Sequence, residues 1–253
     1  MTFDVAAEAY GRFMGRYSEP LAVQFTELAE VRAGQRALDV GCGPGALTAR
    51  LVERLGTDLV AAVDPSASFV AAIRARLPEV DVRSGVAEHL PFPDDRFDVA
   101  LAQLVVHFMT DPVSGLREMA RVTQPGGVVA TCVWDHAGGG GPLATFWQAV
   151  HDTDPGAHDE AELAGAREGH LAQLCEAAGL TCVEPSSLTV RVRYEAFADW
   201  WEPFTLGVVP AGAYVAGLDE RRREALRSRC AQLLPTAAPF DVAASAWCVR
   251  ARA

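Results

Sequence analysis

A glycine-rich turn near the start of the chain is the feature whose residue types most clearly suggest chemistry. Residues 37–48 read ALDVGCGPGALT, so glycines separate one apolar run from the next. Glycine lets backbone groups approach a ligand without obstruction by a side chain. Gly41, Gly43 and Ala46 satisfy the dinucleotide-binding fingerprint, and Asp64 follows at the distance usual for a ribose-binding acid. The pattern leaves three alternatives open: a nicotinamide cofactor, another adenosine ligand, or a tight turn that binds nothing.

The composition excludes several other kinds of chemistry. The formal net charge of −11 argues against nucleic acid as the main partner, because phosphate binding needs clustered cations. Lysine is absent, which excludes a phosphate-loop lysine and a Schiff-base lysine. The six cysteines form no C-x-x-C pair, and their spacing suits neither zinc nor a disulfide framework. We therefore expect no metal site, and we expect mostly buried cysteines in a reducing compartment.

Two further features bear on location. The sequence contains no apolar run of about 18 residues, so we expect no membrane insertion. The opening residues lack the basic start and apolar block of a secretory signal. We therefore expect a cytoplasmic protein, while the oligomeric state cannot be derived from the sequence.

The segments around the glycine turn predict alternating strands and helices. The strand-like runs are RALDVG, LVAAVD, VDVRSG, FDVALAQ and VVATCVW. Helical apolar spacing follows the first and second runs, and Asp111 with Pro112 is expected to open a third helix as N-cap and first-turn proline. The PGG sequence at residues 125–127 is expected to end that segment before the fifth strand. This alternation predicts a parallel sheet with helices on both faces.

The regular alternation ends after residue 135. The glycines at residues 138–141 predict a flexible loop, and a helix is expected over residues 168–178 before Gly179. Residues 180–194 predict a strand region interrupted near Pro185, and the final SAWCVRAR alternates like an edge or antiparallel strand. Between them lie an aromatic-rich segment at 197–218, interpreted as a lid, and a helix from Asp219 to Pro235.

Four blocks of sequence together resemble one enzyme family. LDVGCGPG at residues 38–45 resembles motif I of class I S-adenosylmethionine-dependent methyltransferases. AEHLPFPDDRFDVA at residues 87–100 resembles a block of the type 11 branch, which includes quinone-biosynthesis C-methyltransferases. REMARVTQPGG and the opening YGRFMGRYSEPLA are similar to further parts of that branch. The resemblance spans roughly residues 10–134, in the family's order. It implies a Rossmann-like, doubly wound, mostly parallel seven-stranded sheet with an antiparallel C-terminal strand and a helical lid.

The resemblance also implies how S-adenosylmethionine would be bound. Gly41 and Gly43 would let the backbone meet the methionine end, and Asp64 would accept both ribose hydroxyls. A plain helix N-cap is the alternative for Asp64. Ala87 would offer its backbone N–H to adenine, with Glu88 near the exocyclic amine. The implied cofactor-binding residues are Tyr17, Asp39, Gly41, Cys42, Gly43, Asp64, Pro65, Ala87, Glu88 and, beside the methionine portion, Gln103.

Two places near the implied site are less regular. Val86 stands where many family members have an aspartate that contacts the adenine amine, so packing and backbone contacts would hold adenine here. Tyr10, Arg16 and Tyr17 are candidates to close over the cofactor, with ordinary packing an equal alternative for the tyrosines.

The acceptor side is less defined. His107 follows the fourth strand and is the one histidine we consider as a general base titrating near neutral pH, against a merely structural role. The other histidines are expected to be solvated. Aromatic residues are candidates to wall a partly apolar or aromatic acceptor pocket, with ordinary lid packing as the alternative: Trp134, Trp147, Trp200, Trp201 and Phe204.

These observations favour one function over two others. The expected protein transfers a methyl group from S-adenosylmethionine to a small-molecule acceptor by in-line displacement, releasing S-adenosylhomocysteine. The alternatives are an NAD-dependent oxidoreductase and a non-catalytic S-adenosylmethionine-binding protein. We expect a single domain over residues 1–253. Its parts are a helical lead at 1–30, a cofactor-binding core at 31–135, and an acceptor-side and lid region at 136–253.

Overall fold

A seven-stranded sheet runs through the molecule. The computed structural model describes residues 11–207 and 209–253. The strand order is β3-β2-β1-β4-β5-β7-β6, with β7 antiparallel to both of its neighbours. The strands are β1 (Ala37–Val40), β2 (Val60–Asp64), β3 (Asp81–Ser84), β4 (Phe97–Gln103), β5 (Thr123–Trp134), β6 (Thr181–Tyr194) and β7 (Phe240–Arg252). This confirms the predicted mostly parallel, Rossmann-like architecture.

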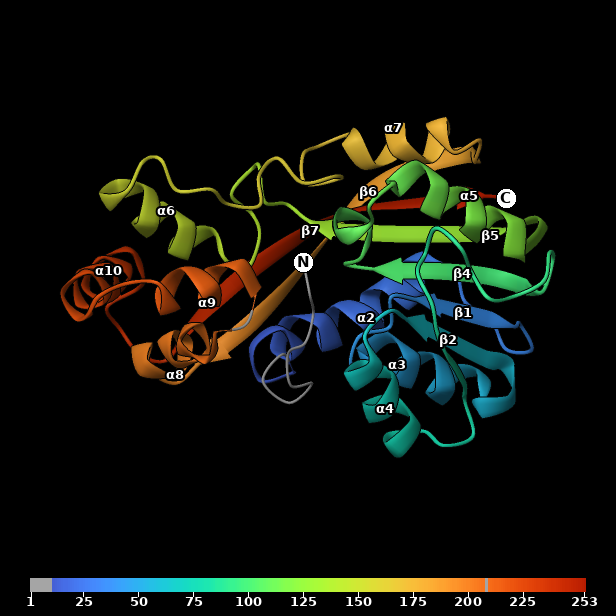
Figure 1. Cartoon of the computed structure of the whole chain (residues 1–253), viewed down its shortest axis with the longest axis horizontal. Coiled ribbons are helices and arrows are strands. Elements are labelled where there is room, and N and C mark those ends of the chain that lie inside the picture. The colour runs from blue at the N-terminus through green and yellow to red at the C-terminus, as the bar shows by residue number, and fades with distance from the viewer. Residues whose placement is uncertain (1–10, 208) are drawn as a thin grey trace.

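Helices cover both faces of this sheet (Figure 1). On one face lie α2 (Arg16–Leu28), α3 (Ala46–Leu55) and α4 (Ala67–Arg76). A short π-helix at Gly11–Gly15 precedes α2. On the other face lie α5 (Pro112–Val122) and α7 (His170–Ala177). The inner strands β1 and β2 are buried along their whole length, which explains their continuous apolar sequences. Asp111 caps α5 through its side chain, as predicted.

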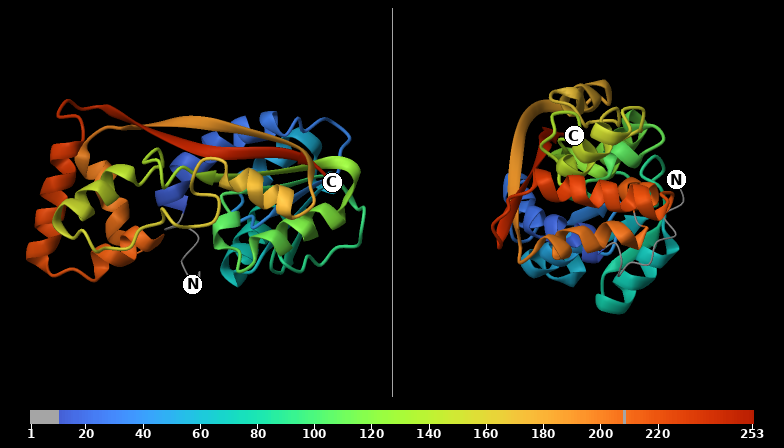
Figure 2. Two further views of the ribbon diagram at one scale, coloured as in Figure 1. Left: turned by 90° about the horizontal axis from the view of Figure 1, so that it is seen from above. Right: turned by 90° about the vertical axis from the view of Figure 1, so that its left-hand side faces the viewer.

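The remaining helices form a separate lobe beside the sheet (Figure 1). They are α6 (Ala144–Thr153), α8 (Phe197–Trp201), α9 (Val209–Ala216) and α10 (Glu220–Leu233), with a 3₁₀ turn at Glu202–Leu206. Strands β6 and β7 are long enough to run from the sheet into this lobe (Figure 2). Short 3₁₀ turns at Thr57–Leu59 and Val106–Phe108 complete the described elements. None of the helices described is long and apolar enough to cross a bilayer.

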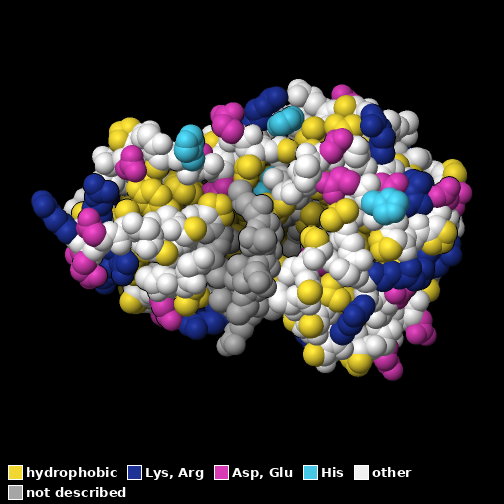
Figure 3. Space-filling view, viewed as in Figure 1, with side chains coloured by type: hydrophobic (Ala, Val, Ile, Leu, Met, Phe, Trp, Pro, Cys, Tyr) yellow, Lys and Arg dark blue, Asp and Glu magenta, His cyan; other side chains and the backbone are white. Residues whose placement is uncertain are grey.

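Surface charges of both signs are intermixed where the lobe faces solvent. Figure 3 shows arginines beside acidic side chains at the end of the molecule that carries α10. Within α10, ion pairs join residues three apart, such as Arg227 with Glu224.

Three strand details differ from the sequence-based expectation. β5 begins at Thr123, which pairs with Phe97, and residues 124–127 form an irregularity within the strand. Pro185 does not interrupt β6: the register shift lies between Thr181 and Glu184, and the proline is tolerated because β6 is an edge strand. β7 is antiparallel as expected, but it lies inside the sheet between β5 and β6.

Candidate functional site

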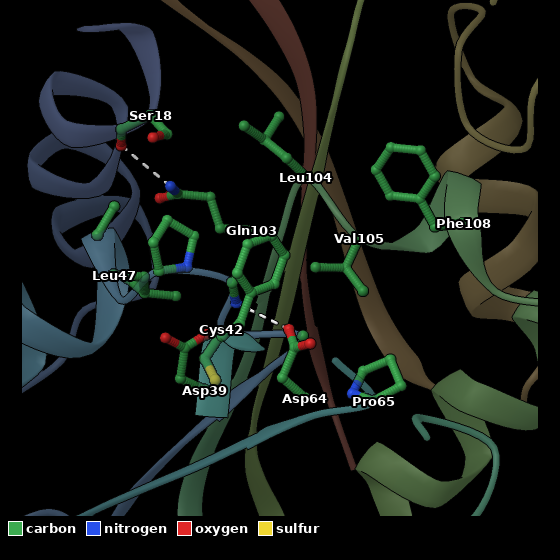
Figure 4. A pocket seen from close by; sticks show the side chains of 15 residues that line it. Ser18, Asp39, Cys42, Leu47, Asp64, Pro65, Gln103, Leu104, Val105 and Phe108 are labelled. Carbon is green, nitrogen blue, oxygen red and sulfur yellow. Dashed lines mark hydrogen bonds between the residues drawn. The ribbon is translucent and has the colours of Figure 1, made fainter. Parts of the chain in front are cut away.

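The glycine turn after β1 borders a cavity of about 110 Å³, which we call the turn cavity (Figure 4). Gly41 has a φ of +69°, and a Cβ there would lie 2.5 Å from a methyl carbon of Val105. Glycine is therefore required at position 41 both by the backbone conformation and by the close approach of the loop that follows β4. The turn cavity is lined by Ser18, Asp39, Gly41, Cys42, Gly43, Pro44, Ala46, Leu47, Asp64, Pro65, Phe69, Gln103, Leu104, Val105 and Phe108.

The N–H groups of Gly41, Cys42, Gly43 and Gly45 form hydrogen bonds within the chain. The N–H groups of Gly41 and Cys42 both donate to the carbonyl oxygen of Val63, at 2.8 and 3.1 Å. The Gly43 N–H donates to Asp64, and the Gly45 N–H donates to the Cys42 carbonyl oxygen. The turn is therefore braced internally. Its glycines provide space and backbone contact rather than a row of free donors.

Asp64 ends β2 with its carboxylate beside the turn (Figure 4). One oxygen accepts the Gly43 N–H and the other accepts the Ser66 N–H, each at 2.8 Å. Burial raises the pKa of Asp64, and these two hydrogen bonds oppose that rise. The N-cap of α4 is Ser66, so Asp64 is not the helix cap that sequence reasoning kept as an alternative. Each carboxylate oxygen retains capacity to accept a further hydrogen bond.

Asp39 is a second carboxylate on the wall of the turn cavity. It is buried, and it accepts a 2.6 Å hydrogen bond from the Thr48 hydroxyl. Burial raises the pKa of Asp39 to about 7, with the nearby Asp64 adding to the effect. The hydrogen bond joins the end of β1 to α3 and thereby fixes the turn between them.

A second cavity, of about 440 Å³, adjoins the first, and we call it the loop cavity. The two cavities share Gly41, Pro65, Val105 and Phe108 as lining residues. Ala87 and Glu88 also line the loop cavity, as do His107 and the loop at residues 109–110. A Glu88 oxygen accepts the N–H groups of Thr110 and Asp111, at 2.7 and 3.2 Å. This contact ties the loop after β3 to the start of α5.

Gln103 ends β4 with one half of its amide unsatisfied (Figure 4). Its Nε2 donates to the Ser18 carbonyl oxygen at 3.0 Å. Its Oε1 is buried and has no hydrogen-bond partner among the residues that the structure describes. A buried acceptor without a donor is costly, so this oxygen is suited to accept from a bound molecule.

His107 is brought to the loop cavity, but not as a base that titrates near neutral pH. It is 9% exposed, and its ring lies 5.9 Å from that of His136. Burial, with a contribution from His136, lowers the pKa of His107 to about 3. The expectation of an ionisation near neutrality is therefore wrong, because desolvation holds the imidazole neutral. Its Nδ1 has no partner within the described chain.

The other histidines differ from one another. His136 was expected to be solvated, but burial lowers its pKa to about 4, and its Nε2 also lacks a partner in the described part of the chain. His89 and His158 are exposed, as expected.

The residues expected to close over the cofactor do not share one position. Tyr17 does not line either cavity: it is 1% exposed, and its hydroxyl accepts from that of Tyr194 at 2.8 Å. Its place on the buried face of α2, against β6, explains why it is a packing residue. Arg16 instead pairs with Asp199 of α8. Tyr10 lies outside the described residues.

The aromatic residues considered for an acceptor wall are mainly packing residues. Trp200, Trp201 and Phe204 are buried and contact one another in the lobe. Trp134 ends β5 beside Tyr17, and its indole N–H has no partner among the residues described. Trp147 is the exception, because it lines a cavity in the lobe.

Sequence reasoning missed several lining residues. Ser18 comes from α2, while Leu104, Val105 and Phe108 come from the segment after β4. Leu104 has a φ of +62°, an unusual conformation for a residue with a side chain. Leu104, Val105 and Phe108 follow a buried strand at the carboxyl edge of the sheet. This position is the signal that could have identified them from the sequence.

Comparison with known proteins gives a family for the core. Residues 38–131 match the family described as a methyltransferase domain. This segment is therefore similar to methyltransferase domains. It contains the glycine turn, Asp64 and Gln103, and therefore most of both cavities.

Curated relatives are similar over the same region. An uncharacterized methyltransferase of Mycobacterium tuberculosis is 39% identical over 135 residues, covering 53% of this chain and 52% of the relative. The ubiquinone/menaquinone biosynthesis C-methyltransferase of Pseudomonas fluorescens is 39% identical over 108 residues, covering 40% and 42%. The aligned part thus spans about half the length, or less, of these relatives.

Solved structures are similar over nearly the whole chain. A putative methyltransferase of Haloferax volcanii, in complex with the Trm112 methyltransferase activator, has a TM-score of 0.60 at 19% identity. The match covers 98% of this chain and 93% of that one. At such identity the likeness concerns the fold, and it includes the lobe as well as the sheet.

Proposed function

We propose that the protein is an S-adenosylmethionine-dependent methyltransferase acting on a small-molecule acceptor. The observation that carries the proposal is the position of the Asp64 carboxylate at the end of β2, beside two adjoining cavities. Open α/β sheets bind ligands at this carboxyl edge. The methyltransferase family of residues 38–131 supports the same ligand class.

The residues present fit S-adenosylmethionine. In this proposal Asp64 accepts the ribose hydroxyls, and Gly41, Cys42 and Gly43 leave room for the methionine portion beside Asp39 and Pro65. The buried Gln103 Oε1 accepts a hydrogen bond at that end. Ala87 and Glu88 border the adenine portion in the loop cavity. The Ala87 N–H makes no backbone hydrogen bond among the described residues, so it is available to a ligand.

The bound cofactor would supply an electrophilic methyl group on a sulfonium sulfur. The acceptor atom would take this methyl group as the carbon–sulfur bond breaks, and the electron pair of that bond would stay on sulfur. The chain's task is then to position both molecules and to exclude water. A neutral His107 suits hydrogen bonding near the acceptor better than proton removal.

We also propose which segments of the chain bind each molecule and where in the cell the protein is located. Residues 31–135 would hold the cofactor and residues 136–253 would select the acceptor, in one domain with the helical lead at 1–30. A cytoplasmic location is supported by six free cysteines, of which five are buried. The charge of −11 supports an acceptor other than nucleic acid.

Titration calorimetry with S-adenosylhomocysteine and with NADH tests the ligand class. We expect saturable binding of S-adenosylhomocysteine and none of NADH. Tight NADH binding without any response to S-adenosylhomocysteine would overturn the proposal in favour of an oxidoreductase. Transfer of labelled methyl to an acceptor separates the enzyme from a non-catalytic binding protein.

A further inference from the structure

A third cavity, of about 350 Å³, lies in the lobe, outside the two cavities assigned to the cofactor. Its walls come from the loop after β5, from α6, and from the loop at residues 159–161. We call it the acidic cavity because three carboxylates are among its lining residues. The side chains that the following argument uses are His136, Trp147, His151, Asp152, Asp159 and Glu160.

Glu160 is the most unusual of these residues. It is 6% exposed, and its carboxylate accepts a short hydrogen bond from the indole N–H of Trp147. No arginine or histidine forms an ion pair with it among the described residues. Burial raises the pKa of Glu160 to about 7, with Asp159 adding to the rise. A buried carboxylate without a cation is costly, and the cost is offset when a cation binds.

The other charged lining residues do not neutralise the Glu160 carboxylate. Asp152 is already paired with Arg229 at 2.7 Å, and Asp159 faces His151 at 3.6 Å. No arginine is among the lining residues, and the sequence contains no lysine. His136 adds a buried Nε2 that has no hydrogen-bond partner in the described chain. The cavity therefore has negative charge and unused hydrogen-bonding capacity, but no arginine or lysine side chain of its own.

Trp147 gives the cavity an aromatic wall. Its ring stacks against that of His151, with centroids 6.3 Å apart and an interplanar angle of 26°. Phe146 and Tyr214 contact Trp147 edge-on and hold its orientation. An aromatic face beside a carboxylate attracts an organic ammonium group by cation–π and Coulombic interactions. No group of three or more potential ligands is arranged to hold a metal ion in the described part of the chain.

Two histidines lie between the acidic cavity and the cofactor region. His136 lines the acidic cavity, and His107 lines the loop cavity. Their rings are in edge contact, with centroids 5.9 Å apart. The loop that carries His107 also carries Val105 and Phe108, which border the turn cavity. The two rings therefore lie between the acidic cavity and the loop cavity.

We propose that the acidic cavity binds a small organic ammonium compound, at a site separate from the two cavities assigned to the cofactor. The site and its ligand class do not depend on the proposed methyltransferase function. Glu160 and Asp159 supply the negative charge, and Trp147 supplies the aromatic face. The protein's overall charge of −11 favours the approach of a cation in the same sense.

Binding of matched probes tests this inference directly. The cationic probes are choline and 2-phenylethylamine, and their neutral isosteres are 3,3-dimethylbutan-1-ol and 2-phenylethanol. Ligand-detected NMR measures each dissociation constant on the full chain. We expect at least one amine to bind roughly ten-fold or more tightly than its isostere, the preference expected of a charge-assisted contact. Equal affinity within both pairs overturns the inference.

Two variants locate the binding. Glu160→Gln keeps an oxygen that accepts the Trp147 N–H and removes the charge, so the preference for the amine should be lost. Glu162→Gln is the matched control, because Glu162 is exposed and does not line the cavity. An amine preference that survives in Glu160→Gln places the cation elsewhere and overturns the assignment. Thermal melting of both variants checks that each is folded.

Failure of this inference is distinguishable from failure of the proposed function. Calorimetry with S-adenosylhomocysteine is carried out on the same three proteins. Normal S-adenosylhomocysteine binding without an amine preference removes only the amine class. Absence of S-adenosylhomocysteine binding removes the methyltransferase proposal and leaves the amine site in place.

Discussion

Arg16 of α2 and Asp199 of α8 form a two-point ion pair between the helical lead and the lobe. The Nη2–Oδ1 distance is 2.7 Å and the Nη1–Oδ2 distance is 3.1 Å. The guanidinium also lies 5.2 Å from the centre of the Tyr194 ring. This arrangement links three segments that are far apart in the sequence.

Breaking this ion pair should loosen α8 more than it destabilises the whole protein. Partly exposed pairs contribute at most about 1 kcal/mol, so Asp199→Asn should lower the melting temperature only slightly. Hydrogen exchange in residues 197–206 should nevertheless become faster. Glu202→Gln, which breaks the more exposed Arg12–Glu202 pair, is the control and should change neither quantity. Unchanged exchange in Asp199→Asn would show that the pair does not hold the lobe.

Asp64→Asn should weaken binding of S-adenosylhomocysteine by roughly ten-fold to a few thousand-fold, because a bidentate contact to a charged acceptor is lost. Asparagine is preferred to alanine, because its single oxygen can still accept one of the two backbone N–H groups that Asp64 holds, whereas alanine can accept neither. Calorimetry gives the affinities. Asp58→Asn, at an exposed position, serves as the control. Wild-type affinity in Asp64→Asn would remove the ribose-binding role.

Gly41→Ala should destabilise the turn, because its Cβ would meet Val105 at 2.5 Å and its φ of +69° disfavours alanine. Val105→Ala in the same chain should restore part of the melting temperature by removing the clashing methyl groups. Gly43→Ala separates the two effects, because its φ is +52° while no atom lies within 4 Å of its Cβ. No recovery in the double variant would contradict the steric explanation.

His107→Ala should leave the pH dependence of kcat unchanged between about pH 5.5 and pH 8, because the pKa of His107 is held at about 3. The imidazole is already neutral over this range, so no protonation limb is lost. The rate profile is measured with saturating acceptor. Loss of a limb near neutrality, with a fall in kcat of roughly 10² or more, would restore His107 as a general base.

Glu160 should make stability fall as the pH rises through its titration range. Its pKa is about 7 in the folded protein against an ordinary value of 4.5, so the folded state binds the proton more tightly than the unfolded state. The stabilisation by the protonated form is present below about pH 4.5 and is lost as the pH approaches 7, at about 1.4 kcal/mol per unit of pKa difference. Urea unfolding between about pH 4.5 and pH 8 should give a flatter profile for Glu160→Gln than for Glu162→Gln. Parallel profiles would contradict the assignment.

The sequence predicted the sheet because its signals are local. Asp111 and Pro112 predict the start of α5, and the apolar runs of β1 and β2 reflect burial on both faces of the sheet. The position of Asp64 followed as well, since a strand end fixes where its last side chain lies. The protonation state of His107 could not be predicted from the sequence, because its pKa depends on burial and on His136, which lies far away in the sequence.

The same limit applies to the lobe. Glu160 and Trp147 meet only because α6 and the loop after it fold together, and no spacing rule connects an acid with an indole N–H. Pro185 was read as an interruption because sequence alone does not distinguish an edge strand from an inner one. Contacts that depend on which distant segments become neighbours require the fold itself.

Strands β6 and β7 make the segment that contains α8, α9 and α10 of the lobe exchangeable. Their pairing is regular from Pro185 with Val249 to Tyr194 with Phe240, so a cut across one register pair keeps every remaining pair aligned. Val190 pairs with Ala244, and the segment between them leaves and re-enters the sheet at this one pair, or rung. A chimaera could therefore take residues 191–243 from a related protein at this rung without altering the parallel sheet. The acidic cavity draws its lining from residues 136–161, so such a graft would change its surroundings while leaving its charges in place.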